Sequence, residues 1–397
     1  MGVAVKPGPT RNHIDFATLV AVMALMLFSM GIVYSASSTV AFKKFDDSEY
    51  VLLNHVAKVG LAIIALFIAM RFDYHRLRRL TKPALVAAIG LLVLTLLVGA
   101  VAKGAVRWIS FGPLNIQPAE FAKYALLFHL CTLISTKGEM LRDFKKGFVP
   151  MMVWIGVVSA LVVLQPNFSM ASIIVLLSMV LLFVGGVRLK HLATVAAPVI
   201  PAMVGILVLA PYRVKRIHEY IDAVIGEFGE GTIPYQLYQG LIALGRGGIF
   251  GVGPGESRQR DFYLPEAHTD FVYSILGEEY GFVGTMFFML LFLLIMGRGY
   301  KIARYAPDRF GCNLAIAVTS AVTLSALVNA GVTLGLLPTT GLPMPFVSYG
   351  GSSMVFTAAA VGVLLNISSQ TDLHPRASQV PVVGSVNAGK AAVGKVY

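Results

Sequence analysis

Long apolar runs that alternate with short charged or glycine- and proline-rich breaks dominate this sequence. Each run approaches the roughly 20 residues that cross a bilayer as a helix. Only 13% of the residues are charged, about half the share of a soluble domain, so most of the chain cannot face water. The sequence therefore predicts an all-α integral membrane protein with about ten transmembrane helices, near residues 14–37, 50–71, 82–102, 119–135, 148–164, 169–187, 191–211, 269–297, 312–337 and 349–368.

The basic residues gather in every second break between these runs. The breaks near 71–82, 137–146 and 298–309 are rich in Lys and Arg, whereas the short breaks on the other side hold only Lys43, Lys44, Lys103 and Arg107. Because Lys and Arg concentrate in cytoplasmic loops, we expect both termini in the cytoplasm. The formal net charge of +12 then reflects topology, and we expect no nucleic-acid partner.

One break, residues 212–268, is much longer than the others and is predicted to lie outside the cytoplasm between the seventh and eighth helices. Long loops in compact proteins usually carry function. This loop opens with the basic cluster Arg213, Lys215 and Arg216. Its glycine-rich run 245–255 is a weak match to a phosphate-binding loop, because no Gly-Lys-Ser/Thr follows it. The predicted organisation is a cytoplasmic tail, a ten-helix domain and a disordered cytoplasmic tail, at 1–13, 14–370 and 371–397.

The strongest candidate for a catalytic motif is the sequence Tyr263-Leu-Pro-Glu-Ala-His-Thr-Asp270, which leads into the eighth apolar run. Asp270, Ser274 and Glu278 recur every four residues and so share one helical face. A carboxylate at a helix N-terminus is favoured by the helix dipole, so one interpretation is that Asp270 only caps the helix. Glu278 and Glu279 lie about two turns into an apolar span, where ionised groups are usually functional or paired.

A second polar cluster lies before and within the fourth run. Arg107 precedes Gln117-Pro-Ala-Glu120, and Lys123 follows Glu120 at i+3. The two side chains can therefore form an ion pair inside the membrane. A structural salt bridge and a ligand site are both open interpretations of this pair.

The third cluster, Pro338-Thr-Thr-Gly-Leu-Pro-Met-Pro345 followed by Ser348-Tyr-Gly-Gly-Ser-Ser353, cannot form a regular helix, because prolines break helices. At membrane depth, irregular backbone occurs only where it is buried in protein or lines a polar cavity. The segment is either a re-entrant loop that lines a site or a plain hairpin outside the membrane.

These motifs together resemble the shape, elongation, division and sporulation (SEDS) family of bacterial membrane proteins over about residues 15–370. The Glu-Ala-His-Thr-Asp form is more similar to the FtsW branch than to the RodA branch. The resemblance is carried by Gly104-Ala-Val-Arg-Trp-Ile109, Gln117-Pro-Ala-Glu120, Ala243-Leu-Gly245, Tyr263-Leu-Pro-Glu-Ala-His-Thr-Asp-Phe271, Gly277-Glu-Glu279 and Pro345-Phe-Val-Ser-Tyr-Gly-Gly-Ser-Ser353.

The resemblance implies a peptidoglycan glycosyltransferase of the bacterial cytoplasmic membrane that polymerises lipid II during septal wall synthesis. It also implies a class B penicillin-binding protein as partner, with other membrane proteins of the division machinery. The family's essential aspartate corresponds to Asp270, the expected general base. A divalent cation such as Mg²⁺ or Mn²⁺ could bind through carboxylates. The expected substrate-binding residues are Glu120, Lys123, Arg107, Glu266, His268, Arg213, Lys215, Arg216, Arg246, Gln239, Ser348 and Ser352.

The sequence departs from the family pattern in three motifs. Ala119 stands where the family usually has Ser, and Asn167, Ser169 and Met170 stand where it usually has Asp, Gly and Thr. The change at Asn167 puts any acidic role at that site in doubt. Arg246 replaces a small residue and adds a cation near the expected pyrophosphate.

Two other function classes fit the same features. Intramembrane carboxylates and lysines are also expected in a flippase for lipid-linked precursors, although such transporters often have internal repeats that this sequence lacks. A non-enzymatic scaffold of the division machinery is the third possibility, for which Asp270 would be dispensable.

Overall fold

Helices make up most of the computed structural model, and each predicted apolar run overlaps one of them. Within the part of the chain that the structure describes, seven helical segments are long and apolar enough to cross a membrane, and α6 is a shorter apolar helix. The predicted all-α integral membrane fold is confirmed, while the count of ten crossings stays a prediction. The helices are α1 (Phe16–Phe45), α2 (Tyr50–Arg71), α3 (Tyr74–Val98), α4 (Pro118–Lys137), α5 (Val149–Leu164), α6 (Phe168–Val184), α7 (Leu189–Val208), α10 (Val272–Arg304), α11 (Arg309–Thr333) and α12 (Gly351–Ser368).

The structure describes most of the chain but not all of it. The predicted tails and the first part of the long loop therefore lie almost entirely outside the described residues. The described residues are 13–98, 100–102, 105–111, 114–208, 221, 234–261, 263–265, 267–371 and 373.

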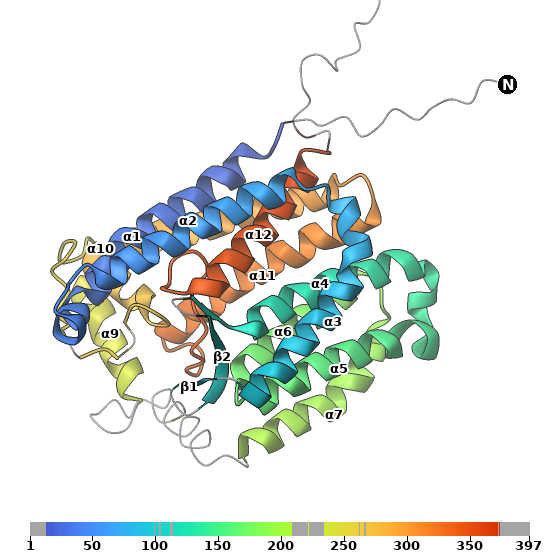
Figure 1. The fold of residues 1–397 in the computed structure, drawn as a ribbon, viewed down its shortest axis with the longest axis horizontal. Helices are drawn as coiled ribbons and strands as arrows, with labels where there is room; N and C mark the ends of the chain where they lie inside the picture. Colours follow the sequence, from blue (N-terminus) through green and yellow to red (C-terminus); the bar gives the residue numbers. More distant parts are fainter. Residues whose placement is uncertain are drawn as a thin grey trace, which may run out of the picture.

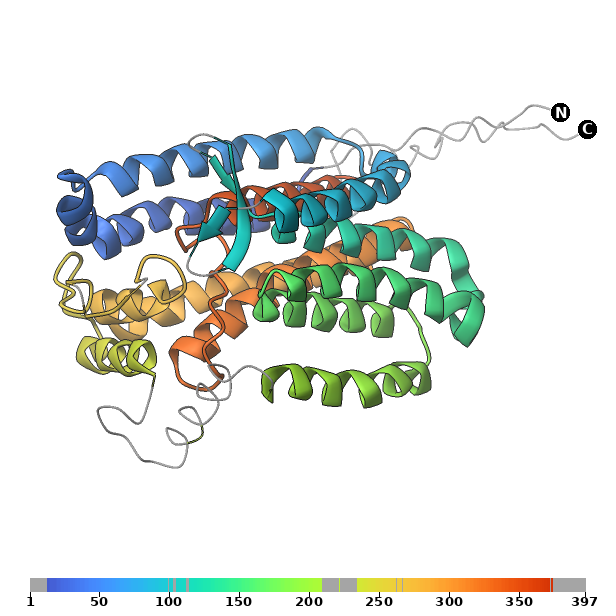
Figure 2. The same ribbon diagram turned by 60° about the horizontal axis from the view of Figure 1, so that its bottom comes forward.

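The helices form a bundle with two sides (Figures 1 and 2). On one side α1, α2, α10, α11 and α12 pack together, and on the other α3, α4, α5 and α6 pack together, with α7 at the edge beside α6. α4 and α11 lie where the two sides meet, and most of their residues are buried. The polar residues of α4 therefore face protein, which is where intramembrane charges are tolerated.

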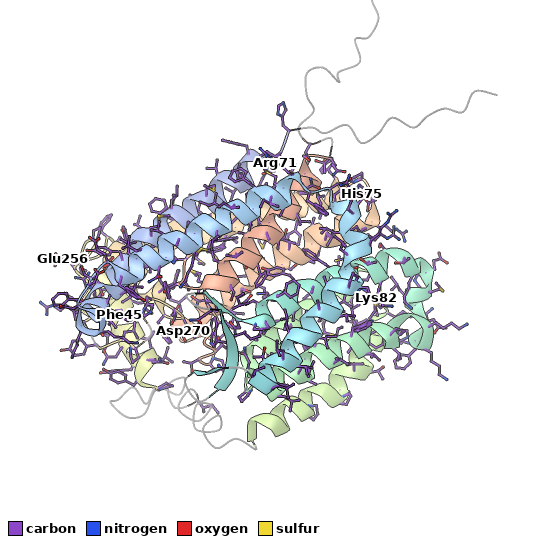
Figure 3. The ribbon with its side chains drawn as sticks, in the orientation of Figure 1. Phe45, Arg71, His75, Lys82, Glu256 and Asp270 are labelled. Atoms are coloured by element: carbon purple, nitrogen blue, oxygen red, sulfur yellow. The ribbon has the colours of Figure 1, made fainter. Side chains whose placement is uncertain are left out.

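Figure 3 shows how labelled side chains divide between the two ends of the bundle. Arg71 and His75 lie at one end, named here the Arg71 end. Phe45, Glu256 and Asp270 lie toward the other, named the Asp270 end. α2, α4, α10 and α12 all begin toward the Asp270 end.

A small antiparallel sheet between α3 and α4 was not predicted. Its strands β1 (Ala100–Ala102), β2 (Ala105–Phe111) and β3 (Leu114–Ile116) are ordered β1-β2-β3, and Ile109 pairs with Ile116. The predicted third helix was wrong in its last residues, because α3 ends at Val98. β-branched and aromatic residues favour strands, and β2 is rich in them.

The long loop contains a helix of its own, α9 (Tyr235–Gly247), which packs on α10. Small residues allow this close packing. A Cβ at Gly247 would overlap the backbone carbonyl of Gly277, and one at Gly240 would lie 2.9 Å from the Ser274 hydroxyl. The loop is therefore fastened to the first turns of α10, next to Asp270.

Candidate active site

Asp270 is half-buried directly before α10. Its Oδ1 accepts a hydrogen bond from the Thr269 hydroxyl at 3.0 Å, and its backbone carbonyl accepts one from the Asn329 amide at 2.9 Å. The N-cap of α10 is Phe271, which makes no side-chain capping bond. Asp270 thus stands one residue outside the helix, with its backbone held by α11.

The irregular segment 338–350 lies against Asp270. The same Asn329 amide donates to the Leu342 carbonyl at 2.8 Å, and a Cβ at Gly341, where φ is +68°, would lie 3.4 Å from Asp270 Oδ2. Phe346 and Val347 are fully or almost fully buried. The absence of helix is confirmed for residues 338–350, whereas the last three residues of the predicted cluster, 351–353, form the first turn of α12. The burial of the segment favours a lining segment over a plain exposed hairpin.

Both predicted serines of this region are engaged in holding it together. The Ser348 hydroxyl accepts a hydrogen bond from the Met344 amide at 2.8 Å, inside the segment's turn. The Ser352 hydroxyl, at the start of α12, accepts one from the Gln117 amide at 3.0 Å, just before α4. These bonds fix the wall of the site, and a role in substrate binding stays a prediction for both.

Glu120 and Lys123 form a buried ion pair. Lys123 Nζ donates to Glu120 Oε2 at 2.7 Å, and both side chains are about 95% or more buried. A cavity of about 10 Å³, enough for about one water molecule, lies beside them and is walled by α4, α6, α11, α12 and segment 338–350. The predicted pair is therefore confirmed, and the cavity beside it is also lined by the segment that lies against Asp270.

Glu278 holds the glycine-rich loop rather than facing the site. Its carboxylate forms an ion pair with Arg246 at 2.7 Å and accepts hydrogen bonds from the Ser257 hydroxyl and from the amides of Arg258 and Gln259. Glu279 accepts a hydrogen bond from the Ser35 hydroxyl of α1. Each of these two buried carboxylates thus has local partners, and the charge of Arg246 is compensated.

The glycine-rich loop packs into a kink of α10 at Gly281, where φ is +64°. The carbonyls of Gly248 and Ile249 accept the Phe282 and Val283 amides at 2.9 and 3.1 Å. Broken helices are tolerated in membranes when the freed backbone groups find such partners. The glycines are needed for this close approach, since a Cβ at Gly251 would overlap the carbonyl of Glu279.

Arg107 connects the sheet to the turn between α5 and α6. Its guanidinium donates to the backbone carbonyls of Gln165, at 3.3 Å, and Pro166. In the next residue, the Asn167 side chain caps α6 by accepting from the Met170 amide at 3.4 Å. Asn and Asp are equally good N-caps, so the departure at Asn167 leaves this local structure intact.

The remaining predicted residues divide into two groups. His268 is half-buried against Tyr349, with ring centroids 5.5 Å apart, and Gln239 is mostly buried on α9. The other four, Arg213, Lys215, Arg216 and Glu266, lie outside the described residues.

Sequence reasoning missed two polar residues near this site. Asn329 in α11 fixes both Asp270 and Leu342 through one amide. Lys58 in α2 lies with its ammonium 3.8 Å from the centroid of the Tyr349 ring. A lysine within the apolar run 50–71 is a signal that could have found it, because charges inside membrane helices are usually functional.

Within the described part of the chain, no group of three His, Cys, Asp or Glu side chains is arranged to hold a metal ion. Glu120, Glu278 and Glu279 are bound to other protein groups. These three carboxylates are therefore already engaged, and a divalent cation at this site stays a prediction.

This fold and site define an all-α integral membrane protein with a half-buried aspartate, a buried Glu–Lys pair and an irregular segment grouped toward one end. A family model of cell cycle proteins, that of FtsW, RodA and SpoVE, matches residues 16–373. The chain belongs to this family, which confirms the resemblance seen in its motifs.

Individual relatives are similar over most of their length. The chain is 39% identical to stage V sporulation protein E of Bacillus subtilis, over 88% of this chain and 96% of the relative. It is also 39% identical to a probable peptidoglycan glycosyltransferase FtsW of Trichlorobacter lovleyi, over 91% and 94%. A solved peptidoglycan synthase complex, described as coordinating polymerization and crosslinking, contains a chain with a TM-score of 0.73 and 28% identity, covering 89% of this chain and 97% of that one. A variant of RodA from Thermus thermophilus gives a TM-score of 0.65 at 25% identity, covering 90% and 98%.

Proposed function

We propose that this protein is a peptidoglycan glycosyltransferase that polymerises lipid II into glycan strands for the division septum, with Asp270 as the general base. The observation that carries the proposal is the half-buried Asp270, whose backbone is fixed by Asn329 and whose carboxylate is approached by segment 338–350. Relatives that bear the name probable peptidoglycan glycosyltransferase support the reaction type.

The reaction forms a glycosidic bond between two sugars and releases a lipid pyrophosphate. The acceptor 4-hydroxyl oxygen attacks the anomeric carbon of the donor, the bond from that carbon to the pyrophosphate oxygen breaks, and the pyrophosphate leaves with the electron pair. Asp270 takes the hydroxyl proton, and a positioned base contributes about 10²–10⁴-fold. The fixed backbone at Asp270 favours this proton transfer, because a small misplacement of a catalytic group lowers the reaction rate.

The proposed sidedness follows from the basic residues. The breaks at the Arg71 end are rich in Lys and Arg, so that end is assigned to the cytoplasm. The Asp270 end then faces outward, where the wall is built, and both termini are cytoplasmic. A class B penicillin-binding protein is the proposed partner, supported by the similarity to a synthase that coordinates polymerization and crosslinking. Other proteins of the division machinery are also proposed partners.

The test is polymerisation of purified lipid II by the purified protein with its cognate transpeptidase. The wild type is expected to make glycan, and Asp270→Asn to make none while it keeps the wild-type melting temperature. Glu256→Gln is the matched control, because Glu256 is an exposed carboxylate at the same end. We expect this control to be fully active.

Two results would overturn the proposal. Full polymerisation by Asp270→Ala would show that Asp270 is not the general base. Translocation of lipid II across liposomes by the wild type, without polymer in the presence of the partner, would show a flippase instead.

A further inference from the structure

Lys58 is a half-buried cation about two turns into α2. Among the described residues, no carboxylate lies within 4.0 Å of its ammonium. A cation without a counter-ion is costly in a membrane helix, and such residues usually mark a polar cavity or a ligand site.

The aromatic ring of Tyr349 holds the Lys58 side chain. The ammonium lies 3.8 Å from the ring centroid, well within the range of a cation–π interaction. The stem of Lys58 packs against the start of α12, where a Cβ at Gly351 would lie 3.4 Å from Lys58 Cε. An aromatic face orients a cation without neutralising its charge, so the ammonium can still attract an anion.

Tyr349 also connects Lys58 to the aspartate. The Tyr349 amide donates to the His268 carbonyl at 2.8 Å, and the two rings lie edge to face. His268 precedes Asp270 by two residues. On the other side, the ring of His55 lies 5.7 Å from that of Tyr349 and one turn of α2 from Lys58. A continuous set of contacts therefore links the cation on α2 to the loop of the base.

The other described cations of the predicted site are already bound to protein groups. Carboxylates neutralise two of them, since Lys123 pairs with Glu120 and Arg246 with Glu278. Arg107 keeps its charge, but its guanidinium is bound to the backbone carbonyls of the turn between α5 and α6. A departing pyrophosphate needs positive charge that is not already neutralised. Lys58 supplies such a charge.

We propose that Lys58 binds the pyrophosphate of the lipid-linked donor, and that Tyr349 positions its ammonium toward that anion. This inference rests on the proposed function for the identity of the ligand. An anionic phospholipid headgroup offers the same phosphate chemistry at this depth, and the experiment separates the two sources.

The experiment measures binding of undecaprenyl pyrophosphate to the full-length protein in nanodiscs, with phosphatidylglycerol as the competing probe. Lys58→Met is expected to weaken undecaprenyl pyrophosphate binding by about tenfold or more, the size of a lost charge-assisted hydrogen bond. Lys58→Arg is expected to restore most of it, since Arg also binds phosphates and aromatic faces. Lys44→Met, an exposed lysine near the same end, is the matched control.

Tyr349 gives a second, independent pair of variants. Tyr349→Phe keeps the aromatic face and is expected to bind like the wild type, whereas Tyr349→Leu is expected to bind several-fold more weakly. This pair keeps the inference testable if Lys58→Met fails to fold, which the melting temperature reports. Equal binding by the Phe and Leu variants would contradict the positioning role.

The outcomes separate this inference from the proposed function. Binding needs no turnover, so Asp270→Asn is expected to bind undecaprenyl pyrophosphate normally while it makes no glycan. Wild-type affinity in Lys58→Met would overturn the role of Lys58 even if polymerisation depends on Asp270. An equal loss of phosphatidylglycerol binding in Lys58→Met would overturn the donor assignment and identify a general anionic-lipid site.

Discussion

Removal of the Glu278 carboxylate should release the glycine-rich loop from α10. The side chain is fully buried and accepts hydrogen bonds from the Arg246 guanidinium, the Ser257 hydroxyl and two backbone amides. Glu278→Ala leaves these donors without their acceptor. Loss of one partner from a buried pair costs about 3–5 kcal/mol. Because the Arg246 side chain is 32% exposed and can rehydrate, we expect the lower end of this range.

Hydrogen exchange over residues 248–259 measures this cost. The Val252 and Gly253 amides donate to the backbone carbonyls of Glu278 and Glu279 at 3.0 Å each, so they exchange only when the loop opens. A cost of about 3 kcal/mol corresponds to exchange faster by roughly 100-fold. Arg246→Ala should accelerate exchange by only about tenfold, because the carboxylate keeps its other three donors.

The relative exchange rates of the variants test whether the Glu278 carboxylate holds the loop. Glu256→Ala removes an exposed carboxylate from the same loop and should leave exchange unchanged. If Glu278→Ala behaves like this control, the loop is held by something other than the carboxylate. If Arg246→Ala is as damaging as Glu278→Ala, the ion pair dominates and the backbone amides contribute little.

Three further changes test other parts of the fold. Burial opposes ionisation of Asp15 at the start of α1, but its hydrogen bonds with Arg298 at 2.9 and 3.2 Å and with Thr18 at 2.9 Å outweigh this and hold its pKa below the usual value near 3.8. This stability is present above that value and lost as the pH falls through the lower folded pKa, so thermal melting should show an acid-sensitive step that Arg298→Gln weakens. Gly281→Ala should prevent folding or loop docking, because its Cβ would meet the backbone at positive φ, whereas Gly297→Ala in the same helix has open space and should keep or slightly raise the melting temperature. Asn167→Asp should be neutral and Asn167→Ala should cost about 1 kcal/mol of unfolding free energy, since the residue caps α6.

The helices were predictable because a bilayer imposes both their length and their apolar character. The sheet between α3 and α4 was not, since the run 82–102 is apolar throughout and its composition does not mark where helix gives way to strand. α3 ends at Val98 and β1 pairs with β2 close by in the chain, Ala100 with Trp108, so the hairpin is a local feature that the apolar composition of this run conceals. α9 was missed because its close contacts through Gly240 and Gly247 are with α10, about 30 residues further along the chain, and exist only once α10 is in place.

The site was predictable where its residues interact within one helix. The spacing of Glu120 and Lys123 predicts their pair, and the structure shows it. The partners of Glu278 come from residues 19 to 32 positions away, so the sequence showed a buried carboxylate but not what neutralises it. Lys58 and Tyr349 are separated by most of the chain, and only the fold brings them together.

The positions of the charges bear on the choice between an enzyme and a transporter. A translocation path requires intramembrane charges that can exchange partners with a passing headgroup. Glu120 and Lys123 are instead paired with each other, and Glu278 is paired with Arg246, all at 2.7 Å. Breaking either buried pair costs about 3–5 kcal/mol, which opposes such exchange. The Arg246–Glu278 pair therefore fastens the loop to α10, and the Glu120–Lys123 pair is closed within α4. In contrast, the half-buried Asp270 and the cation–π-bound Lys58 are connected through Tyr349 near one end, an arrangement suited to chemistry at a single surface.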